Sequence, residues 1–341
     1  MITVQTPKAS IVVCTYDRLR IADLEACVAS LLRQQYDDFE ILIAVDHNKA
    51  LYDVLAKKFE RSKVKVILND SEKRGQASTM NCGLRNSRGE MVCFIDDDAI
   101  ASKEWLMTLV SGYDHSTPGV GGRIEALWLG KKPNYLPEEF YWLVGATGGY
   151  LPAKPMRTRN LWSCNASYKR SVLDELGGFS ETFGGDLGSL LFQGECAELG
   201  LRISKIEGYA PRYVPTAVVY HKIRGDRLRL GWLLGRACRQ GYAKAYIQRL
   251  HGSRYALSVE YGFLDSLVKS NLRRLGHVIH GPEKRYALEQ FGFSLSSTAA
   301  VLIGFVLGLA TIRVSHQDRV KIANRTTNTP PDHTHEASPR S

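Results

Sequence analysis

Three consecutive aspartates, Asp96, Asp97 and Asp98, directly follow the apolar run "MVCFI". Carboxylates this close repel one another, and the repulsion grows beside a buried segment because the dielectric there is low. A hard divalent cation, Mg²⁺ or Mn²⁺, would turn the repulsion between Asp96 and Asp98 into ligation. Such a cation could also hold a diphosphate and neutralise a leaving group. Two aspartates alone are a weak signal, because many acidic surface turns match this pattern.

The elements around these aspartates are predicted from hydrophobic periodicity. Short apolar, β-branched runs predict buried strands, and apolar residues at helical spacing predict helices between them. Strands that alternate with helices in this way predict an α/β fold, with a parallel sheet covered by helices on both faces. The predicted strands are residues 9–14, 39–46, 64–69 and 91–96, and the predicted helices are 21–35, 51–60, 75–87, 171–179 and 194–203.

Acidic residues end two of the predicted strands, Asp46 the second and the aspartate run the fourth. In open parallel sheets, ligands bind outside the carboxyl ends of the strands. We therefore expect these acids to face a ligand crevice rather than a core. From residue 120 to 155 the sequence mixes Gly, Pro and aromatic residues, which predicts long loops of the kind that often cover a substrate.

The composition narrows the class of partner. The chain has 341 residues, a formal net charge of +10 and a pI of about 9.2, which favours nucleic acid, a phosphorylated small molecule or an anionic membrane. Its seven cysteines are scattered and contain no C-x-x-C, which argues against a disulfide framework or a zinc site and favours a reducing compartment. The first residues contain no apolar run, so no cleavable signal peptide is expected.

The C-terminal third differs in composition. Residues 222–254 contain nine Lys or Arg and one acid, with aromatic and aliphatic residues between them, which indicates a basic amphipathic helix at a membrane surface or a solvated helix face. Residues 291–312 carry no charge over 22 positions, which fits a transmembrane or membrane-inserted helix or a buried core helix. We therefore expect a basic helical region at 226–290, a membrane helix at 291–312 and a disordered tail at 313–341.

Six segments carry a family resemblance, and they occur in the order "ASIVVCTYDR", "ILIAVDHN", "RGQASTMNCGLRNSRGEMVCFIDDDA", "WLMTLV", "SCNASYKRSVLDELGGF" and "GECAELGLRI". Over about residues 8–225 the sequence resembles the family 2 glycosyltransferases. The resemblance implies a GT-A fold, Rossmann-like and mostly parallel, for residues 1–225. It also implies transfer of a sugar from a nucleotide-sugar donor, usually with inversion.

The resemblance also implies roles for single residues. Asp46 would accept a hydrogen bond from uracil N3–H, which makes a UDP-sugar the expected donor. Asp46 could instead be a turn residue, Arg74 a solvated cation, and Gly75 a residue required only for its backbone angles. The implied nucleotide-sugar-binding residues are Thr15, Asp46, Arg74, Gly75, Asp96, Asp97 and Asn165.

The implied metal ion is Mn²⁺ or Mg²⁺, held by Asp96 and Asp98. His221 follows another apolar run, at a place where many GT-A enzymes have a histidine that completes the metal shell. Neutral imidazole is a competent ligand. A lone histidine is otherwise more often structural, and that alternative stays open.

The sequence departs from the family pattern at the implied general base. The family typically has an aspartate where this sequence has Cys196 after Glu195. A thiol is a poor substitute, since it loses its proton near pH 8.5 and its thiolate is itself a nucleophile. Glu195 or Glu198 is then the expected catalytic base, with Glu195 favoured. Alternatively, both glutamates only stabilise a helix N-terminus.

The leading hypothesis is a metal-dependent glycosyltransferase at the cell membrane, with its catalytic domain on the cytoplasmic side. Its acceptor would be a polyprenyl- or dolichyl-phosphate-linked glycan or a surface polysaccharide, as in prokaryotic and archaeal lipid-linked glycan enzymes that the sequence resembles. An inactive nucleotide-sugar-binding protein of the same fold is the alternative that Cys196 favours. A haloacid-dehalogenase-like phosphatase would need its D-x-D after the first strand, and no nucleic-acid-binding motif is present.

Overall fold

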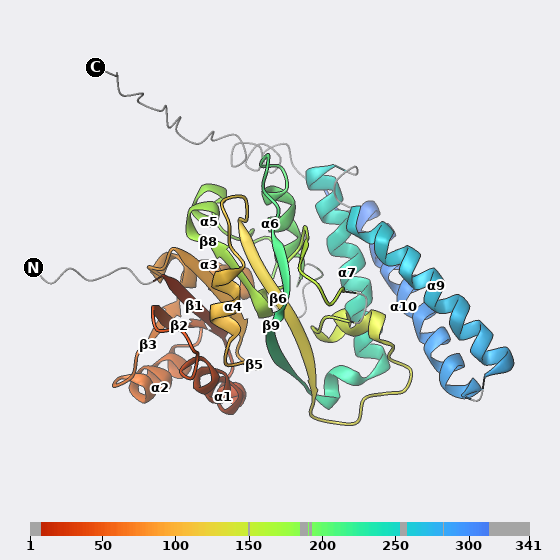
Figure 1. Cartoon of the computed structure of the whole chain (residues 1–341), viewed down its shortest axis with the longest axis horizontal. Helices are drawn as coiled ribbons and strands as arrows, with labels where there is room; N and C mark the ends of the chain where they lie inside the picture. Colours follow the sequence, from red (N-terminus) through yellow and green to blue (C-terminus); the bar gives the residue numbers. More distant parts are fainter. Residues whose placement is uncertain are drawn as a thin grey trace, which may run out of the picture.

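The computed structural model describes residues 8–148, 151–184, 190, 193–252, 258–281 and 283–313. A sheet with flanking helices occupies one side of the molecule, and three long helices lie side by side on the other (Figure 1). The strands are β1 (Ala9–Thr15), β2 (Phe39–Asp46), β3 (Val64–Asn69), β4 (Met91–Asp96), β5 (Ala99–Ala101), β6 (Gly119–Trp128), β7 (Met156–Arg157), β8 (Ala166–Lys169) and β9 (Arg212–Ile223).

The α-helices are α1 (Ile21–Leu31), α2 (Lys49–Phe59), α3 (Gln76–Asn86), α4 (Trp105–Ser111), α5 (Arg170–Leu176), α6 (Glu195–Ile203), α7 (Leu230–His251), α9 (Ser258–His280) and α10 (Lys284–Thr311). Four short 3₁₀ helices connect them, η1 (Arg18–Arg20), η2 (Glu138–Val144), η3 (Ser163–Asn165) and η4 (Gly225–Leu228).

The sheet has the order β3-β2-β1-β4-β8-β6-β9-β5, and β7 pairs with β9. The first four strands are parallel to one another, which confirms the α/β fold predicted from the alternating pattern. The later strands are mixed, since β8 is antiparallel to β4 and to β6, whereas β6 and β9 are parallel. β5 then pairs antiparallel with β9 and so brings the chain after the aspartates next to β9.

The prediction of loops from residue 120 was wrong for its first part, because residues 119–128 form β6. Glycines there interrupt the apolar alternation that marks a strand, but they allow β6 to pair closely with β9. A Cβ on Gly122 would lie 1.8 Å from the carbonyl oxygen of Ala217 in β9. The pairing register of β6 with β9 shifts between Gly122 and Arg123. This glycine therefore lets β6 and β9 approach at a bulge.

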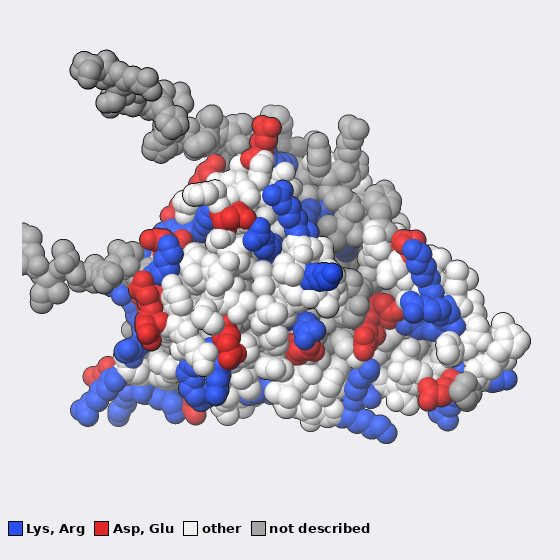
Figure 2. All heavy atoms as spheres, viewed as in Figure 1, with Lys and Arg blue, Asp and Glu red and all other residues white. Residues whose placement is uncertain are grey.

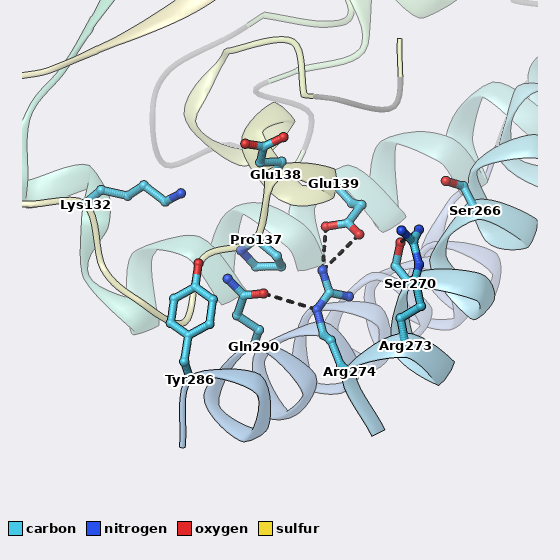
Figure 3. Close-up of a pocket in the computed structure, with 10 residues that line it drawn as sticks. All are labelled: Lys132, Pro137, Glu138, Glu139, Ser266, Ser270, Arg273, Arg274, Tyr286 and Gln290. Carbon is cyan, nitrogen blue, oxygen red and sulfur yellow. Dashed lines mark hydrogen bonds and ion pairs between the residues drawn. The ribbon is translucent and has the colours of Figure 1, made fainter. Parts of the chain in front are cut away.

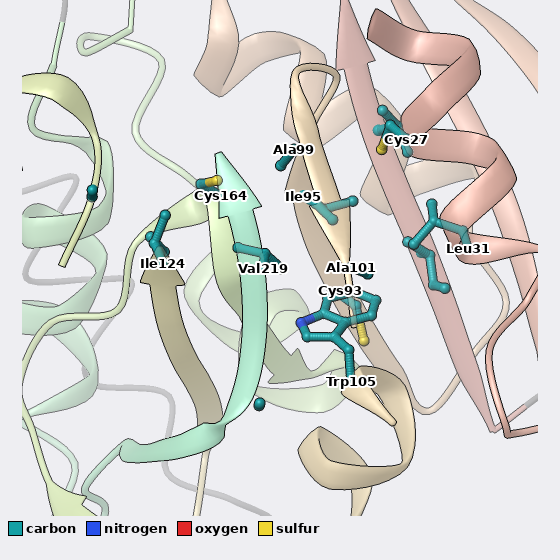
Figure 4. Close-up of a cluster of buried hydrophobic side chains, with 14 of the residues drawn as sticks. Cys27, Leu31, Cys93, Ile95, Ala99, Ala101, Trp105, Ile124, Cys164 and Val219 are labelled. Atoms are coloured by element: carbon teal, nitrogen blue, oxygen red, sulfur yellow. The ribbon is translucent and has the colours of Figure 1, made fainter. Parts of the chain in front are cut away.

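The core consists of two apolar layers, one on each face of the sheet. β1 alternates between them, with Ile11 and Val13 in one layer and Val12 in the other, as the period of two requires. The first layer packs under α1 and α4, and Figure 4 shows Trp105 of α4 and Leu31 of α1 in the same cluster as residues of β4 and β5. The second layer packs under α3 and α5. Helices thus cover both faces, as predicted.

The three long helices pack through small residues. α7 and α10 run in the same direction, and a Cβ on Gly304 of α10 would lie 1.8 Å from the carbonyl oxygen of Cys238 in α7. One turn later, Gly308 packs on Ala245. Such contacts let two helix backbones approach closely. The predicted charge-free segment 291–312 lies in α10 and the residue after it, and the predicted tail beyond residue 313 lies outside the described residues.

α10 is the one helix, among the described residues, that is long and apolar enough to cross a membrane. Its buried face includes the polar or small residues Gln290, Ser294, Ser297 and Gly304, whereas its exposed face is apolar. A helix of a water-soluble protein normally has the reverse arrangement. In Figure 2, the surface over neighbouring α9 is largely white between separate charged groups. The exposed apolar residues of the two helices include Leu264, Val268, Leu272, Ile279, Leu288, Leu295, Leu302, Ile303, Val306 and Leu307.

Candidate donor and catalytic site

Asp98 and His221 meet because of strand pairing. β5 follows the aspartates, and its first residue, Ala99, pairs with His221 in β9. The Nε2 atom of His221 then lies 3.1 Å from Oδ1 of Asp98. The other oxygen of Asp98 lies 2.8 Å from Arg20 and 3.5 Å from Arg227. The predicted metal ligands Asp98 and His221 are thus in direct contact, and both are buried.

The pKa values of Asp96 and Asp98, the outer two of the three aspartates, are shifted in opposite directions. Burial raises the pKa of Asp96 to about 6, and the neighbouring charge of Asp98 adds to the rise. Burial would also raise the pKa of Asp98, but His221, Arg20 and Arg227 together hold this pKa well below its ordinary value. At neutral pH the site therefore contains an ionised Asp98 and an Asp96 whose charge is only weakly compensated.

A possible metal-binding group lies beside this pair. Ligand atoms of Asp96, Cys164 and His221 lie within 4.8 Å of one another, and Nδ1 of His221 is buried without a hydrogen-bond partner in the described part of the chain. Sequence reasoning missed Cys164, because η3 brings it to the site from a loop with no metal-binding spacing. Burial raises the pKa of its thiol well above the ordinary value, and a neutral thiol is a poor ligand for a hard cation. The oxygen and imidazole groups fit Mn²⁺ or Mg²⁺ better than the sulfur does.

Asp97 points to different partners. Its carboxylate accepts hydrogen bonds from Nε of Arg20 at 2.9 Å and from the hydroxyl of Thr15 at 2.7 Å. Asp97 and Thr15 are both buried. The two predicted donor-binding residues therefore bind each other, and Arg20 connects Asp97 to Asp98. Sequence reasoning missed Arg20, because a short 3₁₀ helix, η1, brings it to the aspartates after the neighbouring strand β1.

Asp46 is the last residue of β2, and its side chain contacts the loop that precedes α3. Its carboxylate accepts hydrogen bonds from the backbone N–H of Gly75 at 2.9 Å and from Asn69 at 3.1 Å, and it lies 2.7 Å from Nδ1 of His47. A carboxylate offers about four acceptor positions, so one position remains for a ligand. Gly75 has φ of 104°, which requires glycine, and Arg74 is exposed.

Asn165 has its side chain fully engaged in the fold. Its amide oxygen accepts a hydrogen bond from the indole of Trp105 at 2.8 Å. Its amide nitrogen donates to the carbonyl groups of Arg123 and Ala217 at 2.9 and 2.8 Å. Asn165, a predicted donor-binding residue, is thus 1% exposed. Its hydrogen bonds connect α4 to β6 and β9.

Glu195 and Glu198, both candidate bases on α6, have different surroundings. Glu198 is fully buried, with its carboxylate 2.8 Å from a guanidinium nitrogen of Arg202 and 3.0 Å from Nε2 of His251. Despite burial, Arg202 and His251 lower the pKa of Glu198 to about 2. Glu195 has no ion-pair partner among the described residues, and burial raises its pKa. Its carboxylate accepts a hydrogen bond from the N–H of Gly194 and contacts the thiol of Cys196.

A separate polar cavity of about 410 Å³ lies between η2 and helices α9 and α10 (Figure 3). Its walls carry an ion pair between Arg274 and Glu139 at 2.7 Å, and Arg274 also bonds to Gln290. None of the sequence-predicted site residues lines it. The carboxylate cluster at the end of β4 is therefore a different site from this cavity.

A mixed sheet of this order, with helices on both faces, resembles the sheets of known structures. A mannosyltransferase from Pyrobaculum calidifontis, solved with GDP-Man and Mn²⁺, superposes with a TM-score of 0.54 over 88% of both chains at 18% identity. GalNAc-T7, solved with UDP, GalNAc and Mn²⁺, superposes with a TM-score of 0.51 over 86% of this chain and 58% of that chain. These likenesses identify the GT-A fold.

Sequence comparison identifies the family. Residues 10–177 match the family described as "Glycosyl transferase family 2". The glucosyl-dolichyl phosphate glucuronosyltransferase of Haloferax volcanii is 33% identical over 89% of this chain and 97% of its own length. A GalNAc(5)-diNAcBac-PP-undecaprenol beta-1,3-glucosyltransferase of Campylobacter jejuni is 33% identical over 32% of this chain and 37% of its own. The chain belongs to glycosyltransferase family 2 and is a glycosyltransferase, as the sequence motifs predicted.

Proposed function

We propose that this glycosyltransferase transfers a sugar from a nucleotide-sugar, a UDP-sugar in the first instance, to a lipid-linked acceptor at a membrane. The contact between Asp98 and His221 beside Asp96 carries the proposal, because it gathers two carboxylates and an imidazole at the carboxyl ends of the strands. The relative from Haloferax volcanii, which is named for a dolichyl phosphate-linked substrate, supports the acceptor class.

The metal-binding role is assigned to Asp96, Asp98 and His221. The unpartnered Nδ1 of His221 and the raised pKa of Asp96 both fit residues that a cation would complete. A bound Mn²⁺ or Mg²⁺ would supply neutralisation of the diphosphate leaving group. Both solved neighbours contain Mn²⁺, which favours Mn²⁺ as the first ion to try.

The nucleotide is assigned to the place where Asp46, at the end of β2, meets Gly75 in the loop before α3. The remaining acceptor position of Asp46 suits the N3–H of uracil, and the exposed Arg74 lies in that loop. Thr15 and Asp97 support this site indirectly in the proposal, because they hold Arg20 against Asp98. Asn165 supports it by fixing the strands behind the aspartates.

The general base is assigned to Glu195. It is buried and forms no ion pair with any described residue, so its pKa is raised toward the range in which a carboxylate is an effective base. It would accept the proton of the acceptor hydroxyl as that oxygen attacks the anomeric carbon. Glu198 is assigned to stability instead, because Arg202 and His251 occupy its carboxylate. This assignment works without Cys196, whose thiol stays protonated because burial raises its pKa well above the ordinary value.

Membrane binding is assigned to the apolar surface of α9 and α10. The exposed aliphatic side chains of α10 have no counterpart to pack on among the described residues, and Ile303 and Val306 are each 63% exposed. A lipid bilayer is the partner that suits such a face. Basic residues of the same helices, such as Arg273 and Arg285, would contact anionic lipid headgroups. With seven free cysteines, a cytoplasmic catalytic domain is the favoured orientation.

The test is a transfer assay with purified protein, labelled UDP-sugars, Mn²⁺ and a prenyl phosphate-linked glucose in vesicles. We expect label to move into the lipid phase for one UDP-sugar. Nucleotide-sugar binding without any transfer would favour the inactive alternative. Failure to bind UDP-, GDP- and dTDP-sugars alike would refute the proposed function.

A further inference from the structure

Three arginines of η4 and α7 form what we call the arginine cluster. They are Arg227 in η4 and Arg236 and Arg239 in α7. Arg236 and Arg239 lie on the same face of α7 as Ala243, at helical spacings of seven and four residues. Further along α7, that face packs against the catalytic domain, where Ala243 and Ile247 join an apolar cluster with residues of α6. The arginine cluster therefore lies between α7 and the catalytic domain.

Two of these arginines are half-buried, and each has one buried guanidinium nitrogen without a hydrogen bond within the described part of the chain. The Nε atoms of Arg236 and Arg239 are inaccessible to solvent and have no hydrogen-bond partner among the described residues. Arg236 lies over the ring of Trp232, with its Cζ 5.5 Å from the ring centroid. A buried polar atom without a hydrogen bond is costly. Two such arginines on one helix face, close to a third cation, indicate a site that an anion completes.

The surroundings of Arg236 place it at the catalytic centre. Burial lowers the pKa of Arg236 to about 10, and the positive charges of Arg227 and Arg239 lower it further. Glu195 and Asp96 are near enough to act in the opposite direction. Arg227 also lies 3.5 Å from Asp98. The cluster thus extends from the carboxylates at the end of β4, past the candidate base, along α7.

We propose that the arginine cluster binds a phosphate group of a substrate, with Arg236 and Arg239 as its principal donors. The planar guanidinium fork matches the oxygens of phosphate and pairs with them through charge-assisted hydrogen bonds. The phosphate has two possible sources, the diphosphate of the donor and the phosphate that links an acceptor to its lipid. This proposal rests on the proposed function, and it assigns residues outside the aspartate, histidine and glutamate set.

The experiment titrates the full-length protein with two probes, UDP in the presence of Mn²⁺ and farnesyl phosphate in detergent. The variants are Arg236→Gln and Arg239→Gln. The matched control is Arg229→Gln, which removes an exposed charge from the start of the same helix. We expect each cluster variant to bind one probe about 10- to 100-fold more weakly, and the control to bind both as the wild type does.

The pattern of loss identifies the source of the phosphate. Weaker binding of UDP assigns the cluster to the donor diphosphate, and weaker binding of farnesyl phosphate alone assigns it to the acceptor. Unchanged affinity for both probes in the two variants would overturn the proposal while leaving the proposed function intact. Wild-type protein that binds neither probe would instead refute the proposed function and this site with it.

Thermal melting separates lost binding from lost folding. Because Arg236→Gln removes a guanidinium with a buried, unpartnered Nε atom, the variant should melt at the same temperature as the wild type or higher. Arg236→Lys, which keeps the charge but loses the fork, should recover part of the affinity. If Arg236→Gln proves unfolded, an Arg236→Lys protein that is folded and binds both probes as the wild type does would count against the proposal.

Discussion

Nε2 of His221 lies 3.1 Å from Oδ1 of Asp98, although His221 belongs to β9 and Asp98 to the turn after β4. The antiparallel pairing of β5 with β9 produces this contact, and Arg20 and Arg227 surround the other carboxylate oxygen. The contact brings a carboxylate and an imidazole together at the sheet edge where ligands of α/β proteins bind.

Asp98→Asn should weaken metal-dependent UDP binding, because the amide is a much poorer ligand for a hard cation than the carboxylate. We expect a loss of at least about tenfold, measured by calorimetry with Mn²⁺. His221→Gln should act in the same direction. The control is Asp53→Asn on α2, which removes an exposed carboxylate that pairs with Lys49. Wild-type affinity in folded Asp98→Asn protein would exclude Asp98 from the metal site.

Substitution of the two α6 glutamates should separate catalysis from stability. Glu195→Gln should lower kcat by about 10²- to 10⁴-fold, because the amide cannot accept the proton, and should leave the melting temperature unchanged or higher. Glu198→Gln should destabilise the fold by about 3–5 kcal/mol, because the buried Arg202 loses its counter-charge. Activity assays and urea unfolding measure the two effects. Full activity in Glu195→Gln would remove Glu195 from the mechanism.

The opposite pKa shifts of the two glutamates should place their pH effects in different pH ranges. Glu195 must be ionised to act and has a raised pKa, so kcat should fall as the pH drops through that raised value, above the ordinary 4.5. Glu198 has a pKa lowered to about 2 from 4.5. Its contribution to stability is fully present above about pH 4.5 and is lost as the pH falls toward 2. A pH–rate profile and acid unfolding curves of wild type and Glu198→Gln test this difference.

Gly304→Val should destabilise the packing of α7 on α10 by about 1–3 kcal/mol, because its Cβ would overlap the carbonyl of Cys238. Gly292→Val on the same helix is the matched control, since no atom lies within 4 Å of the Cβ position there. Thermal melting in detergent measures both. Equal melting temperatures for the two variants would contradict the close helix contact.

Replacing Leu302, Ile303 and Val306 with serine should weaken binding to anionic vesicles by at least about tenfold, because each buried aliphatic side chain contributes about 1.5–3 kcal/mol. UDP binding should not change, since these residues lie on the exposed face of α10. Vesicle flotation compares the triple variant with wild type. Equal flotation would mean that the membrane contact lies elsewhere on the chain.

The first half of the sheet was predictable because its signals are local. Strands β2, β3 and β4 begin and end at the predicted residues 39–46, 64–69 and 91–96. β6 was missed because Gly119, Gly121 and Gly122 remove the apolar alternation that marks a strand, and only contact with β9 explains them.

The site was predictable in part for the same reason. Asp46 and the aspartates could be placed by the strands that they end, whereas the partners of Glu198 could not. His251 reaches Glu198 from α7, 53 residues further along the chain, and no local pattern predicts such a contact. Cys164 and Arg20 were missed because short 3₁₀ helices bring them to the aspartates, and these helices have no periodic signal.

The most direct test of the metal-dependent donor site is calorimetric titration of the wild-type protein with UDP, first with Mn²⁺ and then with EDTA. The arrangement of Asp96, Asp98 and His221 predicts saturable binding with Mn²⁺ and at least about tenfold weaker binding with EDTA. Equal affinity in the two titrations would contradict the metal site. Absence of binding to UDP, GDP and dTDP with Mn²⁺ would contradict the donor site itself.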